Sequence, residues 1–101
     1  MRVVIDSKGS SRLEEAADFR RFSVSTLFPA NALDRIAGLL GTSIVFETPL
    51  VAWVKVEALV RMAGPADDQW KSGLDTMLEK VKPFGWFDEE HGAVRAHVTW
   101  P

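Results

Sequence analysis

A run of thirteen residues in the second half of the chain places the strongest constraint on its fold. Between Leu50 and Met62 every even position is apolar, whereas the odd positions mix apolar, aromatic and charged side chains. Because successive side chains of a β-strand point to opposite faces of the sheet, this period of two predicts one long strand over residues 50–62 with its even face in the core. At ~3.3 Å per residue, such a strand would extend for roughly 43 Å and overhang a compact domain of this size.

Two other segments have the apolar spacing of amphipathic helices. In residues 33–40, apolar side chains recur at i, i+3, i+4 and i+7, and Gly41 is placed to end the helix. In the second segment, which starts near Pro65, a single apolar stripe runs from Trp70 to Val81. Each stripe needs a hydrophobic partner, so both helices are predicted to cover the core face of a sheet.

Shorter patterns predict the remaining elements. Residues 3–5 and 43–47 are brief extended runs, and residues 22–28 alternate apolar and polar side chains as a half-buried strand does. Residues 86–100 predict a hairpin, in which two strands flank a polar turn. A Ser-x-x-Glu capping box predicts a short helical turn over residues 12–17.

Together these elements predict one α+β domain over residues 1–101. The chain has the length of a single domain, and its 47% apolar and 26% charged residues are an ordinary globular balance. The element order predicts a two-layer sandwich, with a mainly antiparallel sheet and two amphipathic helices on one face. Its architecture would be a ferredoxin-like βαββαβ variant with an extra N-terminal strand and a C-terminal hairpin.

Composition narrows the classes of function. The formal net charge is −2, so the chain lacks the excess of basic residues that is typical of a protein that binds nucleic acid. The absence of cysteine excludes disulfides, thiolate metal ligands and a cysteine nucleophile. No segment approaches the ~18 apolar residues of a membrane span, and no apolar signal region follows the first residues, so a soluble cytoplasmic protein is expected.

No motif for a cofactor or a metal is recognisable. The loop over residues 7–11 contains Gly, Lys and Ser but not in the order of a phosphate-binding loop. His91 and His97 would lie roughly 20 Å apart on an extended segment, at ~3.3 Å per residue, which is too far for a shared metal ion. The acidic residues 88–90 beside His91 are interpreted as a solvated turn. We therefore expect neither a metal nor a cofactor.

The best candidate site is the sheet face turned away from the helices. It is expected to carry the polar and aromatic residues Trp53, Lys55, Glu57, Arg21, Arg95 and His97. His97 is the candidate general acid or base, with Glu57 to orient it, because an imidazole titrates near neutral pH. The candidate ligand-binding residues are Trp53, Lys55, Arg21 and Arg95. The alternative is a solvated or dimer-covered face whose charges pair across strands.

Two functions remain open. The first is a small cytoplasmic homo-oligomeric binding or interaction protein, paired through the outer sheet face or the edge of the long strand, with a small molecule or a protein as its partner. The alternative is a cofactor-free isomerase or hydrolase-like enzyme that acts on a small anionic or aromatic substrate in a sheet-face pocket. The sequence leaves open whether the protein is an enzyme.

Overall fold

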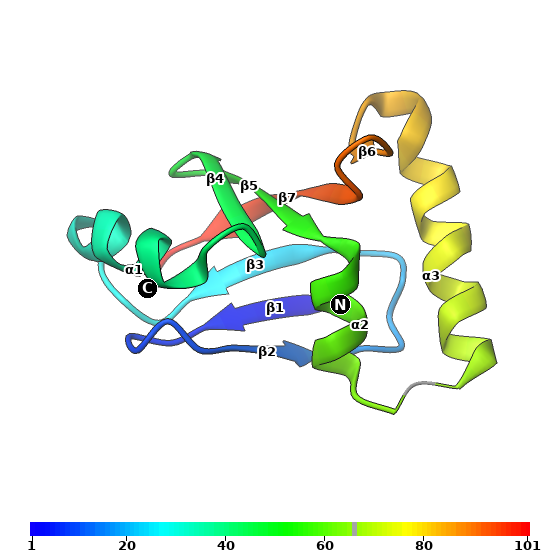
Figure 1. The fold of residues 1–101 in the computed structure, drawn as a ribbon, viewed down its shortest axis with the longest axis horizontal. Coiled ribbons are helices and arrows are strands. Elements are labelled where there is room, and N and C mark those ends of the chain that lie inside the picture. Colours follow the sequence, from blue (N-terminus) through cyan, green and yellow to red (C-terminus); the bar gives the residue numbers. More distant parts are fainter. Residues whose placement is uncertain (66) are drawn as a thin grey trace.

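A computed structural model describes residues 1–65 and 67–101 as an α+β fold with one mixed sheet (Figure 1). Its strands are β1 (Arg2–Ile5), β2 (Ser11–Glu14), β3 (Ser23–Thr26), β4 (Ile44–Thr48), β5 (Val51–Lys55), β6 (Phe87–Asp88) and β7 (Ala93–Thr99). Its α-helices are α1 (Leu33–Leu40), α2 (Val56–Ala63) and α3 (Asp68–Val81), and short 3-10 turns occupy Ala30–Ala32 and Lys82–Phe84.

The strand order is β2-β1-β3-β7-β5-β4, and β6 adds to β7. β3 runs parallel to both β1 and β7, whereas the other pairs are antiparallel. The α+β class is thus confirmed. The ferredoxin-like order and the two-layer sandwich are not confirmed, because three strands precede α1 and two helices follow β5 directly.

The even positions of β5 and β7 point into the core, as predicted. Val54, Val94 and Val98 are at most 2% exposed. In Figure 1, α2 lies over the sheet near β1 and β2 on the side nearer α3, α1 lies at the opposite end of the strands and α3 passes the near end. α2 contributes Leu59 to the core, and α3 contributes Leu74. The three helices therefore surround the core from different directions.

The predicted long strand is wrong in its second half. β5 ends at Lys55, and residues 56–63 form α2. The backbone N–H of Val56 donates to the Gly92 carbonyl, at 2.8 Å, so the turn between β6 and β7 meets the start of the helix. Gly64 ends α2 with φ 74°, a conformation that suits glycine. The overhang that a long strand would produce does not exist.

The predicted helical turn over residues 12–17 is also wrong. Residues 11–14 form β2, which pairs antiparallel with β1. The Glu14 carboxylate accepts from the Arg2 guanidinium at 2.9 Å and from Arg12 at 3.0 Å, and these bonds lower the pKa of Glu14. Glu14, the glutamate of the apparent capping box, therefore forms an ion pair across the two strands and does not cap a helix.

The other predicted elements are confirmed. The strands near residues 3–5, 22–28 and 43–47 and the C-terminal hairpin are present, as are both predicted helices. α3 begins where Asp67 accepts a hydrogen bond from the backbone N–H of Trp70, at 2.8 Å, as an N-cap does. In the described parts of the chain, no helix is both long enough and apolar enough to cross a membrane.

Candidate functional site

Strand alternation brings four of the predicted site residues onto one sheet face, which we call the open face. Trp53 and Lys55 lie on β5, and Arg95 and His97 lie on β7. Trp53 pairs with Arg95 in the register of the two strands. Because β5 and β7 bury their even residues, these odd residues all point to the side opposite the core.

The other two predicted site residues lie elsewhere. Glu57 is in the first turn of α2, so the strand alternation that would place it beside His97 does not reach it. Arg21 precedes β3 and lines a separate hollow with Arg2 and Asp18. The expected grouping of Glu57 with His97 and of Arg21 with Arg95 is therefore not seen in the structure.

A cavity of about 410 Å³ opens where the sheet splits. β3 pairs with β7 from His97 onward, whereas β6 pairs with β7 only at Ala93 and Val94. The stretch of β7 between these two pairings is bounded by the Trp86 backbone, whose carbonyl accepts from the Arg95 N–H at 2.7 Å. We call this space the split-sheet cavity.

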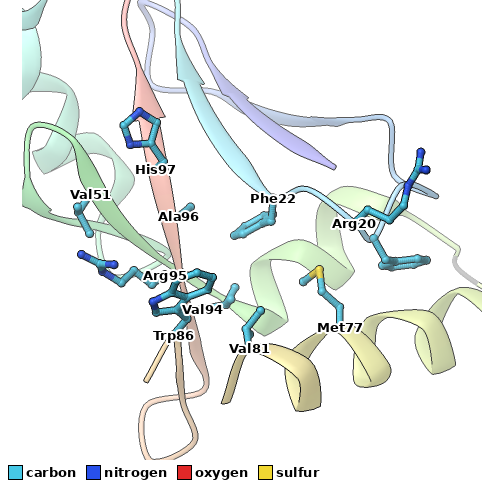
Figure 2. Close-up of a pocket in the computed structure, with 11 residues that line it drawn as sticks. Arg20, Phe22, Val51, Met77, Val81, Trp86, Val94, Arg95, Ala96 and His97 are labelled. Atoms are coloured by element: carbon cyan, nitrogen blue, oxygen red, sulfur yellow. The ribbon is translucent and has the colours of Figure 1, made fainter. Parts of the chain in front are cut away.

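The walls of the split-sheet cavity come from both faces of the sheet and from α3 (Figure 2). Its apolar lining residues are Phe19, Phe22, Val51, Met77, Val81, Trp86, Val94 and Ala96. Its polar lining residues are Arg20, Arg95 and His97. Apolar walls with a few polar groups are typical of small-molecule sites.

The wall formed by residues 15–22 is held against α3 by three contacts. The Trp70 indole N–H donates to the Ala16 carbonyl at 2.8 Å. The Phe19 ring packs so closely over Gly73 that a Cβ at this position would lie 2.5 Å from the ring. Phe19 also packs against Trp70, with ring centroids 6.1 Å apart. The absence of a side chain at Gly73 thus lets this segment approach the helix.

The opposite wall includes Trp86, which follows α3 and the short 3-10 turn. Phe84 and Trp86 pack with ring centroids 5.1 Å apart, and they are 68% and 43% exposed. Both backbone polar groups of Trp86 are hydrogen-bonded. Its N–H donates to the Val81 carbonyl at 3.3 Å, and its carbonyl accepts from the Arg95 N–H. No pattern in the sequence indicates a cavity beside Trp86.

Trp53 and Lys55 belong to a second hollow on the open face. This hollow measures about 470 Å³ and is lined by Thr42, Val45, Glu47, Trp53, Lys55, Asp88, His91 and Ala93. The Trp53 indole N–H donates to Glu47 at 3.2 Å, and the Lys55 ammonium donates to the His91 carbonyl at 3.0 Å. Both side chains already have partners within the chain, and neither lines the split-sheet cavity.

The turn between β6 and β7 gathers the carboxylates of Asp88 and Glu90 and the His91 ring, with ligand atoms within 4.8 Å of one another. The Asp88 carboxylate makes two hydrogen bonds with His91. One is to the ring Nδ1 at 2.7 Å, and the other is accepted from the backbone N–H at 3.2 Å. These hydrogen bonds lower the pKa of Asp88. Bonds from an aspartate side chain commonly stabilise a turn, and here they account for the proximity of Asp88 and His91.

No protein-family model, curated protein or solved structure matches this chain. Its function is therefore argued from the geometry of these residues.

Proposed function

We propose that this protein is a small-molecule binding protein whose ligand occupies the split-sheet cavity. The observation that carries the proposal is the cavity itself, about 410 Å³ in volume and with eight apolar residues among its eleven lining residues. Ligand pockets commonly measure about 300–1,000 Å³ and combine such walls with a few polar groups. The cytoplasmic location predicted from the sequence is part of this proposal.

The site favours binding over the alternative of a cofactor-free isomerase or hydrolase-like enzyme. General acid–base catalysis needs a titratable group in hydrogen-bond reach of the reacting atom, commonly oriented by a second group. His97 is exposed, and within residues 1–65 and 67–101 its ring bonds to no other side chain, whereas the His91 ring bonds to Asp88. An enzyme at this site would depend on His97 alone, without an orienting carboxylate.

Replacing Val51 with phenylalanine is expected to abolish ligand binding by filling the cavity. Val51 lines the cavity from β5, where an aromatic residue is well tolerated. Binding is measured on the full chain by NMR, as shifts of the Val94 and Ala96 amides on addition of small apolar fragments of different charge. We expect some fragments to shift these amides in the native protein and none to do so in Val51→Phe.

Val45→Phe is the matched control. Val45 lies on the same open face, on β4, but lines the second hollow and not the split-sheet cavity. Fragments should therefore shift the same amides in Val45→Phe as in the native protein. Native protein whose cavity amides respond to no fragment, or a Val51→Phe variant that binds normally, would contradict the proposed site.

A second candidate function, self-association, is favoured by an apolar strip on the open face. Val45 is 49% exposed and lies opposite Trp53 in the register of β4 and β5, and Val51 follows on β5. Contiguous exposed apolar surface on a sheet is a common site of association. The long strand over residues 50–62 is absent, so the proposal of a homodimer rests on this apolar strip.

Replacing Trp53 with glutamate is expected to convert such a dimer into a monomer, because two carboxylates would be buried face to face. The molar mass of the native protein and the variant is measured by light scattering in one buffer. Leu39→Glu is the control, since Leu39 is 59% exposed but lies on α1. A native protein of monomer mass, or a Trp53→Glu variant of dimer mass, would remove this candidate.

A further inference from the structure

The ionisable residues that line the split-sheet cavity are all basic. They are Arg20, Arg95 and His97, and neither aspartate nor glutamate lines the cavity in the described parts of the chain. The chain as a whole has 14 aspartate and glutamate residues, 12 lysine and arginine residues and two histidines. The basic lining is therefore a local property of this site and does not follow from the overall composition.

Arg95 is the half-buried member of this set. Within residues 1–65 and 67–101 its guanidinium forms no ion pair, whereas Arg2, Arg12 and Arg20 each pair with a nearby carboxylate. A guanidinium presents five N–H donors in a planar fork that matches the two oxygens of a carboxylate. Arg95 thus offers a set of donors at the cavity that no carboxylate of the described residues occupies.

Two of the three basic side chains lie together at one side of the cavity. Figure 2 shows Arg95 and His97 on one side of the cavity, beside Val51, and Phe22 and Met77 on the other. Arg20 is directed away from the other lining residues and pairs with Asp18 at 3.4 Å. A ligand that satisfies both sides would place its charge at β7 and its apolar body toward α3.

We propose that the ligand is a compact aromatic molecule with one anionic group, in the simplest case a carboxylate. This inference rests on the proposed binding function of the cavity. The carboxylate is held by Arg95, with His97 beside it, and the ring lies among Phe22, Trp86 and Met77, side chains that pack well against an aromatic ring. The volume of about 410 Å³ is near the small end of the range for ligand pockets and favours a compact molecule.

Three probes with the same ring and different charge test the ligand class. Phenylacetate is anionic, phenylacetamide is neutral and phenethylamine is cationic. Each is titrated into the full chain while the amide shifts of Val94 and Ala96 are followed by NMR. We expect phenylacetate to bind roughly ten- to a hundredfold more tightly than phenylacetamide, because it adds a charge-assisted hydrogen bond. Phenethylamine should bind most weakly.

Arg95→Met keeps much of the side-chain length and removes the charge. We expect it to weaken phenylacetate binding by about ten- to a hundredfold and to leave the affinity for phenylacetamide almost unchanged. Arg95→Lys should fall between the native protein and Arg95→Met, because it keeps the charge but loses the planar fork. Arg35→Met is the control, since Arg35 is exposed on α1 and should not affect either probe.

The outcomes separate the ligand class from the binding function. If the three probes shift the cavity amides with equal affinity, the cavity binds ligands but the anionic class is wrong. If phenylacetate binds Arg95→Met as tightly as the native protein, the anion is not held at Arg95 and the inference is overturned. If neither the three probes nor the broader set of fragments shifts the cavity amides, both the binding function and the ligand class are overturned.

Discussion

Replacing Leu59 with alanine is expected to lower the free energy of unfolding by about 2–5 kcal/mol, the usual cost of removing a buried leucine side chain. Leu59 is completely buried and packs from α2 into the core. In a continuous strand over residues 50–62, Leu59 would instead lie on the mixed outer face. The measurement is the urea unfolding midpoint and slope, followed by tryptophan fluorescence and by circular dichroism.

Val60→Ala is the comparison that separates helix from strand. Val60 is only half-buried in α2, and alanine is a better helix former than valine, so this change should cost less than about 1 kcal/mol. A long strand would reverse the order, because Val60 would then face the core and Leu59 would not. If Val60→Ala proves more destabilising than Leu59→Ala, residues 56–63 are not helical as described.

The strand prediction failed at residue 56 because the sequence of residues 56–63 is compatible with both a strand pattern and a helix pattern. Residues 56–63 contain only two charged residues, so an apolar set can be chosen with a period of two or with a helical period. Glu57 and Arg61 are four residues apart, which places both on one face of a helix, and their order suits the helix dipole. This signal was present in the sequence, and the regular alternation up to Lys55 obscured it.

Segments that are amphipathic over two or more turns could be predicted well. α1 and α3 each bury one continuous stripe, and α3 also has its own N-cap in Asp67. β2 could not be predicted, because four residues that are exposed or half-buried carry little pattern of their own. Its conformation depends on pairing with β1, in which Glu14 lies opposite Arg2. Local capping signals compete with such pairing, and in β2 the pairing prevails.

The open face was predictable, but the cavity was not. Strand alternation alone places Trp53, Arg95 and His97 on one side of the sheet. The cavity depends instead on the strand order, because β3 and β6 both meet β7 and leave a space between them. Its lining residues come from segments as far apart as Phe19 and His97. A pattern within one segment contains no information about such a junction.

Trp70 is expected to have the next largest effect, on both stability and binding, because it attaches residues 15–22 to α3. Trp70→Ala removes the ring contact with Phe19 and the indole hydrogen bond to the Ala16 carbonyl. We expect a loss of about 3 kcal/mol in the free energy of unfolding, at the low end for a tryptophan because Trp70 is only half-buried. The released segment carries Phe19 and Phe22, so the affinity for phenylacetate should fall as well.

Trp70→Phe separates the two contributions. Phenylalanine keeps an aromatic ring against Phe19 but has no N–H to donate to the Ala16 carbonyl. The free energy of unfolding should therefore fall by about 1 kcal/mol for the lost hydrogen bond, and by a further small amount for the lost ring area. Unfolding is measured with circular dichroism, because the change removes one of the fluorescent residues, and phenylacetate affinity is measured by NMR on protein that remains folded. If Trp70→Ala loses stability but keeps full affinity, the wall formed by residues 15–22 does not contribute to the site. The ligand would then be held by β7, Trp86, Val51 and the α3 residues of the cavity, without the segment that precedes β3.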